Sequence, residues 1–286
     1  WDNENKTVII IDFNKITEEL KEKTPFLQKI FDLEIEPLES FKSVSEIEGK
    51  IIYKDKEDKK KNETLEVEGS LKLNLSKEKL LEMYIDLNFD GKGMIYDSIK
   101  EAGIYNLETG IIMNNETVYV MTKKDGEEIW TNLGTSTDTS VMSSINLSNS
   151  FNSYEKFVEV IKESVGELNI YSYEAIKQII DMYAKIYNED NFSISGSGKV
   201  KTIKYDIDIM EVIAAMYPQN MEQVGNIKMN VSASEKVSDK KVDSAKVDFE
   251  ISLENPSSKE EFKIDMELDM KYKNINGDFK IEIPKV

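Results

Sequence analysis

The side chains that could do chemistry in this sequence are carboxylates, lysines, tyrosines and hydroxyls. The 286 residues include 37 Lys plus Arg, all of them lysine, 55 Asp plus Glu, and neither Cys nor His. Thiol nucleophiles, imidazole bases, zinc-thiolate sites and arginine clamps for phosphate are therefore excluded. What remains is the chemistry of carboxylates, either paired for glycoside hydrolysis or arranged around a hard cation.

One stretch has the spacing of a calcium-binding loop. Asp86–Gly91, DLNFDG, is followed by Asp97 at the position of the last ligand, where the usual residue is Glu. However, Leu87 and Phe89 continue an alternation of apolar and polar residues that begins at Met83. That alternation favours a strand with a wet face that ends in an Asp-Gly turn. We therefore predict no metal site here.

Two further motifs are incomplete. Ser195–Lys199, SGSGK, resembles a phosphate loop but lacks the first Gly at the required spacing and has Val200 where Ser or Thr is needed. Ser76-x-x-Lys79 and Ser153-x-x-Lys156 have the spacing of a Ser-Lys acylase without its partner motifs. From these motifs we predict no catalytic residue and no cofactor, and we expect the chain not to be an enzyme.

The charge of the chain bears on its partners. The net charge is -18, and such a surface repels nucleic acid and anionic bilayers. The densest run of lysines, Lys54–Lys61, is interrupted by acids and is best interpreted as a solvated hairpin tip. We therefore expect no nucleic-acid partner. The sequence also contains no apolar stretch near the roughly 20 residues that a spanning helix needs.

Alternation of apolar and polar residues predicts antiparallel strands in both halves of the chain. The strands expected before the middle are Leu65–Leu75, Met83–Phe89, Thr117–Thr122 and Glu127–Leu133. Those expected after it are Ile203–Ile209, Ile227–Ala233, Val247–Leu253 and Phe262–Tyr272. Each strand has one apolar face and one polar face, which argues against a parallel sheet covered on both sides.

The Asn276-Gly277 dipeptide predicts a two-residue turn after the last of these strands. Such a turn would pair Tyr272 with Ile281 and Met270 with Ile283, which places apolar side chains on one face of a terminal hairpin.

Helices are predicted near the N-terminus and in the middle of the chain. Asn14 can cap a helix that presents Ile16 and Leu20, and Thr24-Pro25 can begin a second one. Ser153 and Ser172 can cap two amphipathic helices in mid-chain.

Together these elements predict an α+β fold. We expect a large curved antiparallel sheet, a half-barrel, with helices covering its concave apolar face. Residues 1–286 would form a single domain. The alternative is two small α+β halves, 1–133 and 154–286, joined by the loop 134–153, which is rich in Ser, Thr and Asn.

The order of these elements resembles the LolA, LppX and LprG group of bacterial envelope lipoproteins, and related clostridial and bacillary lipoproteins. The likeness depends on the N-terminal helix, the strands Leu65–Leu75 and Met83–Phe89, the helices over Ser153–Tyr187, and the C-terminal INGDFKIEI. It implies an open half-barrel whose apolar face often holds acyl chains. Many members of the group are tethered through a lipidated Cys. This chain has no Cys, so such a membrane tether would lie upstream of Trp1.

We therefore expect a non-enzymatic protein that binds a lipid or other lipophile, such as an acyl chain, between sheet and helices. Its expected place is extracytoplasmic, secreted or tethered to the outer face of the cytoplasmic membrane. The exclusive use of Lys and the abundance of Ile and Asn point to an AT-rich, Gram-positive bacterium. The residues expected to line the ligand cavity are Leu71, Leu73, Ile85, Leu87, Ile176, Ile180, Tyr183, Met266, Leu268 and Met270.

Two other hypotheses stay open at this point. The first is an envelope interaction or sensory module with a collapsed core and no ligand. The second is a carboxylate-dependent hydrolase, which predicts a cleft with two adjacent carboxylates, one of them with a raised pKa.

Overall fold

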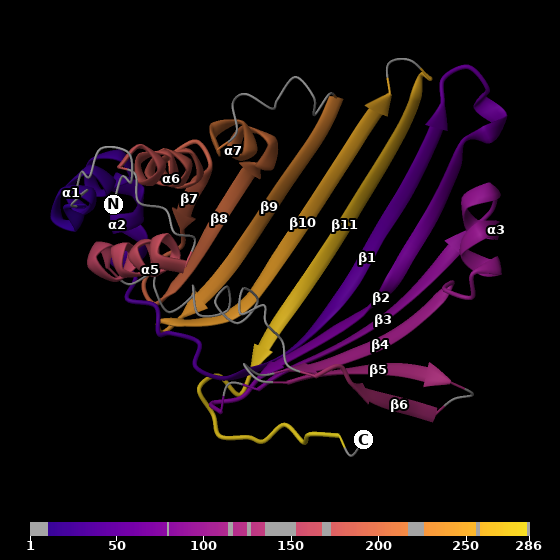
Figure 1. Ribbon diagram of the computed structural model, residues 1–286, viewed down its shortest axis with the longest axis horizontal. Coiled ribbons are helices and arrows are strands. Elements are labelled where there is room, and N and C mark those ends of the chain that lie inside the picture. The colour runs from indigo at the N-terminus through magenta and orange to yellow at the C-terminus, as the bar shows by residue number, and fades with distance from the viewer. Residues whose placement is uncertain are drawn as a thin grey trace, which may run out of the picture.

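The fold is an open, curved antiparallel sheet with helices, of the α+β class that the sequence predicts (Figure 1). The computed structural model describes residues 11–78, 80–113, 117–124, 127–134, 153–167, 173–216, 226–255 and 258–284. The sheet has eleven strands in the spatial order β6-β5-β4-β3-β2-β1-β11-β10-β9-β8-β7. The strands of the first half are β1 (Phe41–Asp55), β2 (Glu63–Leu75), β3 (Leu81–Gly91), β4 (Asn106–Met113), β5 (Val118–Lys124) and β6 (Glu127–Asn132). Those of the second half are β7 (Phe192–Ser195), β8 (Val200–Asp208), β9 (Asn226–Ser238), β10 (Lys241–Asn255) and β11 (Glu260–Lys273).

The sheet has two chemically different faces because side chains alternate along each strand. On β11, Met266, Leu268 and Met270 point to one face and Asp265 and Glu267 to the other. Residues that are opposite each other on neighbouring strands share a face, so the same two faces continue from strand to strand. Over most of the sheet this separates an apolar face from a charged face, as the alternation in the sequence predicts.

The two halves of the chain meet in the middle of the sheet. Strand β1 pairs with β2 on one side and with β11 on the other, in continuous register from Lys42–Lys273 to Asp55–Glu260. The tip between β1 and β2 contains a short 3₁₀ helix, Lys59–Lys61, and its lysines are exposed. The prediction of a solvated hairpin tip at this lysine run is confirmed.

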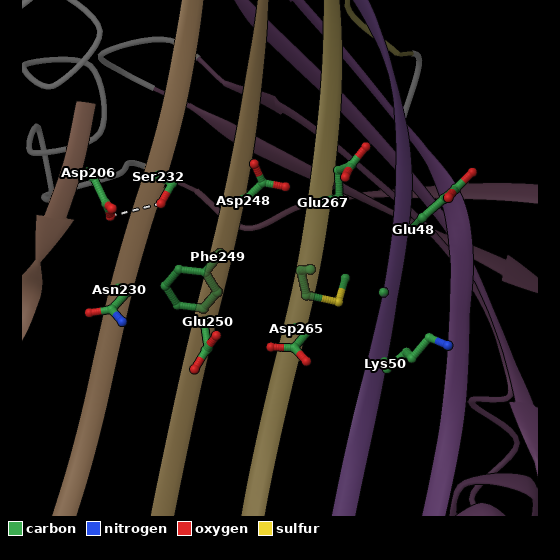
Figure 2. A pocket seen from close by; sticks show the side chains of 12 residues that line it. Glu48, Lys50, Asp206, Asn230, Ser232, Asp248, Phe249, Glu250, Asp265 and Glu267 are labelled. Carbon is green, nitrogen blue, oxygen red and sulfur yellow. Dashed lines mark hydrogen bonds between the residues drawn. The ribbon is translucent and has the colours of Figure 1, made fainter. Parts of the chain in front are cut away.

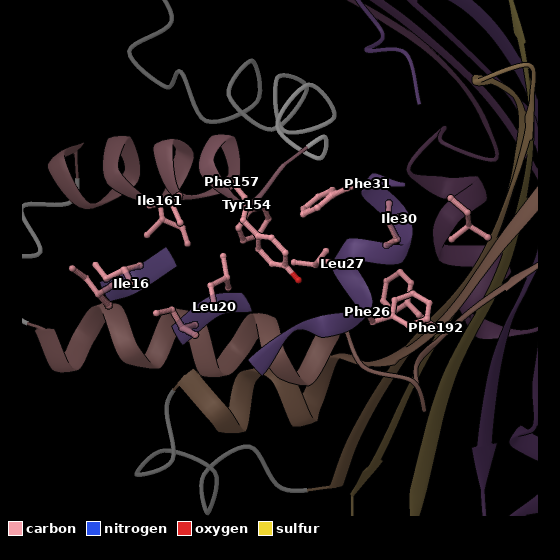
Figure 3. Close-up of a cluster of buried hydrophobic side chains, with 14 of the residues drawn as sticks. Ile16, Leu20, Phe26, Leu27, Ile30, Phe31, Tyr154, Phe157, Ile161 and Phe192 are labelled. Carbon is pink, nitrogen blue, oxygen red and sulfur yellow. The ribbon is translucent and has the colours of Figure 1, made fainter. Parts of the chain in front are cut away.

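Most of the helices gather at one end of the sheet. They are α1 (Phe13–Lys23), α2 (Pro25–Phe31), α5 (Tyr154–Glu167), α6 (Tyr173–Ile186) and α7 (Ile209–Met216). Figure 1 shows the first four beside β7 and β8, with α7 near the ends of β8 and β9. The first four form a buried cluster with Phe192 of β7 (Figure 3). Ile203, Val237 and Val242 of β8, β9 and β10 belong to the same cluster.

The helix α3 (Met94–Glu101) lies apart from this group, beside β2 and β3. The carboxylate of Glu63 on β2 accepts hydrogen bonds from the backbone N–H groups of Met94 and Ile95, at 2.6 and 2.8 Å. A carboxylate satisfies the free N–H groups of a helix N-terminus and is favoured by the helix dipole. Glu63 therefore fixes α3 to the sheet. The sequence patterns did not predict this helix.

The helix starts agree with the sequence in part. The cap of α1 is Asp12 and not Asn14, because Asp12 Oδ1 accepts from the N–H groups of Asn14 and Lys15. Pro25 begins α2 as expected, and Ser153 Oγ accepts from the N–H of Lys156 in α5. The predicted cap at Ser172 and most of the predicted loop 134–153 lie outside the described residues.

The prediction of a terminal hairpin at Asn276-Gly277 is wrong. Strand β11 ends at Lys273, and both of its edges are already paired, one with β1 and the other with β10. No edge is free for a partner strand. The apolar side chains after the turn pack elsewhere: Ile281 is buried with Leu80 and Ile112.

Asn276 instead ties the C-terminal segment to the start of β1. Its φ of 55° is in the left-handed region, which Asn tolerates better than most residues. Its side chain accepts a hydrogen bond from the N–H of Glu39 at 2.9 Å and donates to the carbonyl of Pro37 at 3.0 Å.

We expect the substitution Asn276→Ala to lower the free energy of unfolding by about 2 kcal/mol, because it removes these hydrogen bonds and strains a left-handed residue. The matched variant Asn276→Gly removes the same side chain without the strain and should lose about 1 kcal/mol. Urea denaturation of both variants measures the difference. Equal stability of the wild type and the alanine variant would contradict this account.

Candidate functional site

The middle of the apolar face is only half-buried. Between the helix cluster and α3, the apolar side chains of three adjacent strands have intermediate exposure. We call this group the central patch: Ile47 and Ile51 on β1, Val247, Phe249 and Ile251 on β10, and Ile264, Met266 and Leu268 on β11. None of these side chains belongs to the three buried clusters of the described residues. Side chains nearer the helices are buried, such as Val237, Val242 and Ala245.

The strand residues predicted to line a cavity share this face. Across four adjacent strands, Leu268 is opposite Ile47, Ile47 is opposite Gly69, and Gly69 is opposite Leu87. In the next row, Met270 is opposite Ser45, Ser45 is opposite Leu71, and Leu71 is opposite Ile85. Leu73 and Met266 lie on the same face in neighbouring rows. All seven predicted strand residues are half-buried. The structure therefore places them together on the apolar face.

The predicted helix residues lie apart from this group. Ile176 and Ile180 are fully buried inside the helix cluster, and Tyr183 packs against Phe157 with ring centroids 4.6 Å apart. Their spacing on α6 correctly indicates a buried helix face. That face is directed to other helices and to the strands from β7 to β10, so these three residues form the core that holds the helices on the sheet.

A gap in the central patch is filled by a flexible side chain. Gly49 on β1 has no side chain, and a Cβ atom there would lie 2.4 Å from the sulfur of Met266. The thioether of Met266 therefore lies across Gly49. Unbranched Met side chains adapt to irregular space more readily than branched ones. The central patch can consequently change its shape at this point without a change in the backbone.

Two serines on the apolar face differ in their bonding. Ser43 and Ser45 on β1 are both buried. Ser43 Oγ donates to the carbonyl of Leu73 at 3.1 Å, whereas Ser45 Oγ is buried without a hydrogen-bond partner. A buried hydroxyl without a partner is destabilising by about 1–3 kcal/mol.

Glu235 on β9 is the charged residue that sequence reasoning missed. It follows Met229, Val231 and Ala233 at the next position of the apolar series, and Val237 comes after it. Register places it between Ile203 on β8 and Ala245 on β10. The signal in the sequence is a carboxylate at an inward position of an alternating strand, where an apolar residue is expected.

The surroundings of Glu235 are aromatic. Burial raises the pKa of its carboxyl group above the usual range. Burial, and then the charge of Glu235, raise the pKa of Tyr205 and of Tyr272 to about 12. The pKa of Tyr187, just after α6, is raised first by burial and also by the nearby Tyr183, Tyr205 and Glu235. Glu235 therefore lies among three tyrosines that come from different elements. In the described part of the chain, it makes no hydrogen bond and no ion pair.

The opposite face carries a row of carboxylates. Asp248, Glu267, Glu48 and Glu68 are directly opposite one another across four adjacent strands. Like charges in this arrangement repel. Lysines relieve part of the repulsion, as in the ion pair of Lys246 with Glu267 at 2.7 Å. Figure 2 shows three of these acids around a surface depression of about 510 Å³.

Asp248 and Glu267 are the adjacent carboxylates that a hydrolase would need. Burial raises the pKa of Asp248, and Glu267 adds to the increase through its charge and a hydrogen bond. However, Asp248 is exposed on an open surface, and the charge of Lys246 lowers its pKa in turn. We interpret this row as part of a solvated, charged face.

The described residues also bear on metal binding and on membrane insertion. They contain no group of three or more Asp or Glu side chains that could hold a metal ion. Asp86, Asn88 and Asp90 of the calcium-like motif lie on strand β3, as the alternation predicts. None of the helices in the described ranges has the length and apolar character needed to cross a membrane.

Comparison with known proteins gives little. No protein-family model and no curated protein matches this sequence. Among solved structures, the chain is weakly similar to one titled "Lipid-protein interactions in lipovitellin", with a TM-score of 0.35 and 7% identity. The match covers 87% of this chain but 26% of that chain, so this protein spans about a quarter of the lipovitellin chain. We base no argument on a likeness of this size, and the resemblance to LolA-type proteins stays a prediction.

The two serines of β1 provide a matched pair of substitutions. We expect Ser45→Ala to raise the free energy of unfolding by about 1 kcal/mol, because it removes a buried hydroxyl that has no partner. Ser43→Ala should lower it by about 1 kcal/mol, because it removes a hydrogen bond. Denaturant unfolding measures both. A loss of stability in the Ser45 variant as large as in the Ser43 variant would contradict the assignment.

The raised pKa of Glu235 predicts a dependence of stability on pH. An acid whose pKa is higher in the folded state binds more protons there, so stability falls as the pH rises from its unfolded pKa through the folded one. Glu235→Gln removes this loss. We expect the free energy of unfolding of the Gln variant to increase relative to that of the wild type as the pH is raised above about 4.5. Urea denaturation over a pH series tests this, and a difference independent of pH would contradict it.

Proposed function

We propose that this protein binds a lipophilic ligand with an extended apolar part, such as an acyl chain, on the central patch of its sheet. It acts by binding and not by catalysis, outside the cytoplasm of a bacterium, either secreted or tethered to the outer face of the cytoplasmic membrane. The single observation that carries the proposal is the half-buried state of the central patch, which lies between the helix cluster on one side and α3 on the other.

The energetic basis is the removal of apolar surface from water. Side chains of the central patch bury part of their surface against one another but keep the rest exposed. An apolar chain laid on them would remove that surface and its own from water. Each methylene so buried contributes about 0.8 kcal/mol, so even a chain that is partly covered gains several kcal/mol.

The central patch is suited to ligands that vary in shape. Met266 fills the space above Gly49, and a rotation of its side chain would open that space. Strands β1, β10 and β11 are paired on both edges, so the floor of the patch is held by hydrogen bonds. A rigid floor with a flexible lining favours binding through shape and apolar contact.

Neighbouring residues on β11 allow a matched test. Leu268 is in the central patch, and Asp269 points to the charged face. We expect Leu268→Asn to weaken the binding of N-phenyl-1-naphthylamine, a neutral apolar dye, by about tenfold, which is about 1.4 kcal/mol. Asp269→Asn should leave the dissociation constant unchanged. Fluorescence titration of both variants and the wild type measures the effect.

Native mass spectrometry of gently purified protein adds an independent test and is expected to show a bound lipophile. Two results together would contradict the proposal: no bound lipophile, and equal dye binding by both variants. They would favour the interaction or sensory module, whose apolar face meets a protein partner.

A further inference from the structure

Glu235 lies at the border between the helix cluster and the central patch. Glu235 is opposite Ala245 on β10, and Ala245 is opposite Met270 on β11. The next residue on the same face of β10 is Val247, which belongs to the central patch. Ala233 and Ala245, the small neighbours on either side, are buried. The carboxylate of Glu235 therefore lies at the boundary between the part of the apolar face that the helices cover and the half-buried central patch.

The described residues around Glu235 supply no positive charge of their own. The titratable groups near it are Tyr187 just after α6, Tyr205 from β8 and Tyr272 from β11. No described lysine forms an ion pair with it. A half-buried carboxylate without a counter-charge is destabilising. Among the described residues the site therefore has a carboxylate and tyrosine hydroxyls but no cation, which is a charge that a ligand can supply.

The chemistry of the site favours an ammonium group over other donors. A protonated amine would pair with the carboxylate by charge-assisted hydrogen bonds. The faces of tyrosine rings attract the same cation through their π electrons. A carboxylate surrounded by tyrosines therefore discriminates in favour of ammonium and against a second carboxylate, which Glu235 would repel.

We infer that Glu235 and the tyrosines around it bind the ammonium head of a cationic amphiphile whose apolar chain lies on the central patch. The inference rests on the proposed function, because it needs the apolar chain to be on that patch. It adds the class of ligand: a long-chain amine in preference to an uncharged or anionic lipophile of the same length.

Three probes of equal chain length test the inference: dodecylamine, dodecanol and dodecanoic acid, each used to displace N-phenyl-1-naphthylamine from the full chain. At about pH 8 the wild type should bind the amine about tenfold more tightly than the alcohol, and the acid more weakly than both. Glu235→Gln should reduce the ratio of amine to alcohol affinity to near one. Asp248→Asn removes the same charge from the opposite face and should leave that ratio unchanged.

The pH dependence of the wild type provides a measurement that needs no variant. The amine keeps its proton up to about pH 10, whereas Glu235 loses its own as the pH rises. The ratio of amine to alcohol affinity should therefore increase between about pH 5 and about pH 8. Tyr205 and Tyr272, with pKa values of about 12, stay neutral over this range.

The outcomes separate this inference from the proposed function. If all three probes bind, but with a ratio that neither Glu235→Gln nor pH changes, the inference is overturned and lipophile binding stands. If neither the dye nor any probe binds to the wild type, the proposed function is overturned, and the inference with it. A loss of the amine preference in the Asp248 variant as large as in the Glu235 variant also overturns the inference, because it would show an effect of net charge alone.

Discussion

The structure depends on one constraint, which is that successive side chains of a strand point to opposite faces of the sheet. Long strands with strict alternation give eleven strands one largely apolar face and one largely charged face. A single open sheet cannot bury its own apolar face. Four helices cover the part of that face near β7 and β8, α3 lies beside β2 and β3, and the strands between them stay half-buried. The candidate site is thus a direct result of a sheet that is larger than its helical cover.

The same constraint explains what the sequence could predict. Alternation over Leu65–Leu75 and Met83–Phe89 predicted β2 and β3 with the correct faces. The spacing of Ile176 and Ile180 predicted a buried helix face. These patterns are local and repeated, so the predictions made from them do not depend on contacts between distant parts of the chain. The helix α3 was not predicted, because its start depends on Glu63, thirty-one positions before Met94.

The terminal hairpin failed for a related reason. Asn276-Gly277 is a strong local signal, but which strand pairs with β11 is decided by partners far away in the chain. The candidate site was predicted in part. Strand residues such as Leu71 and Leu268 share the apolar face by parity alone, whereas the place of α6 relative to that face could not be inferred from its own sequence. Glu235 was visible as an inward carboxylate, but its tyrosine neighbours come from elements that only the fold brings together.

The pairing of β1 with β11 has a consequence for the order in which the protein forms during synthesis. Ile47 is opposite Leu268, which leaves the ribosome more than two hundred positions later. Strands β1 to β6 can pair with their neighbours as they appear, and so can β7 to β11, because each set is a meander of adjacent strands. The outer edge of β1 has no partner until β11 is complete, and such long-range pairing is the slow part of folding. The central patch spans this junction, so it is assembled last, and a nascent chain cannot engage a ligand there before its final strand is made.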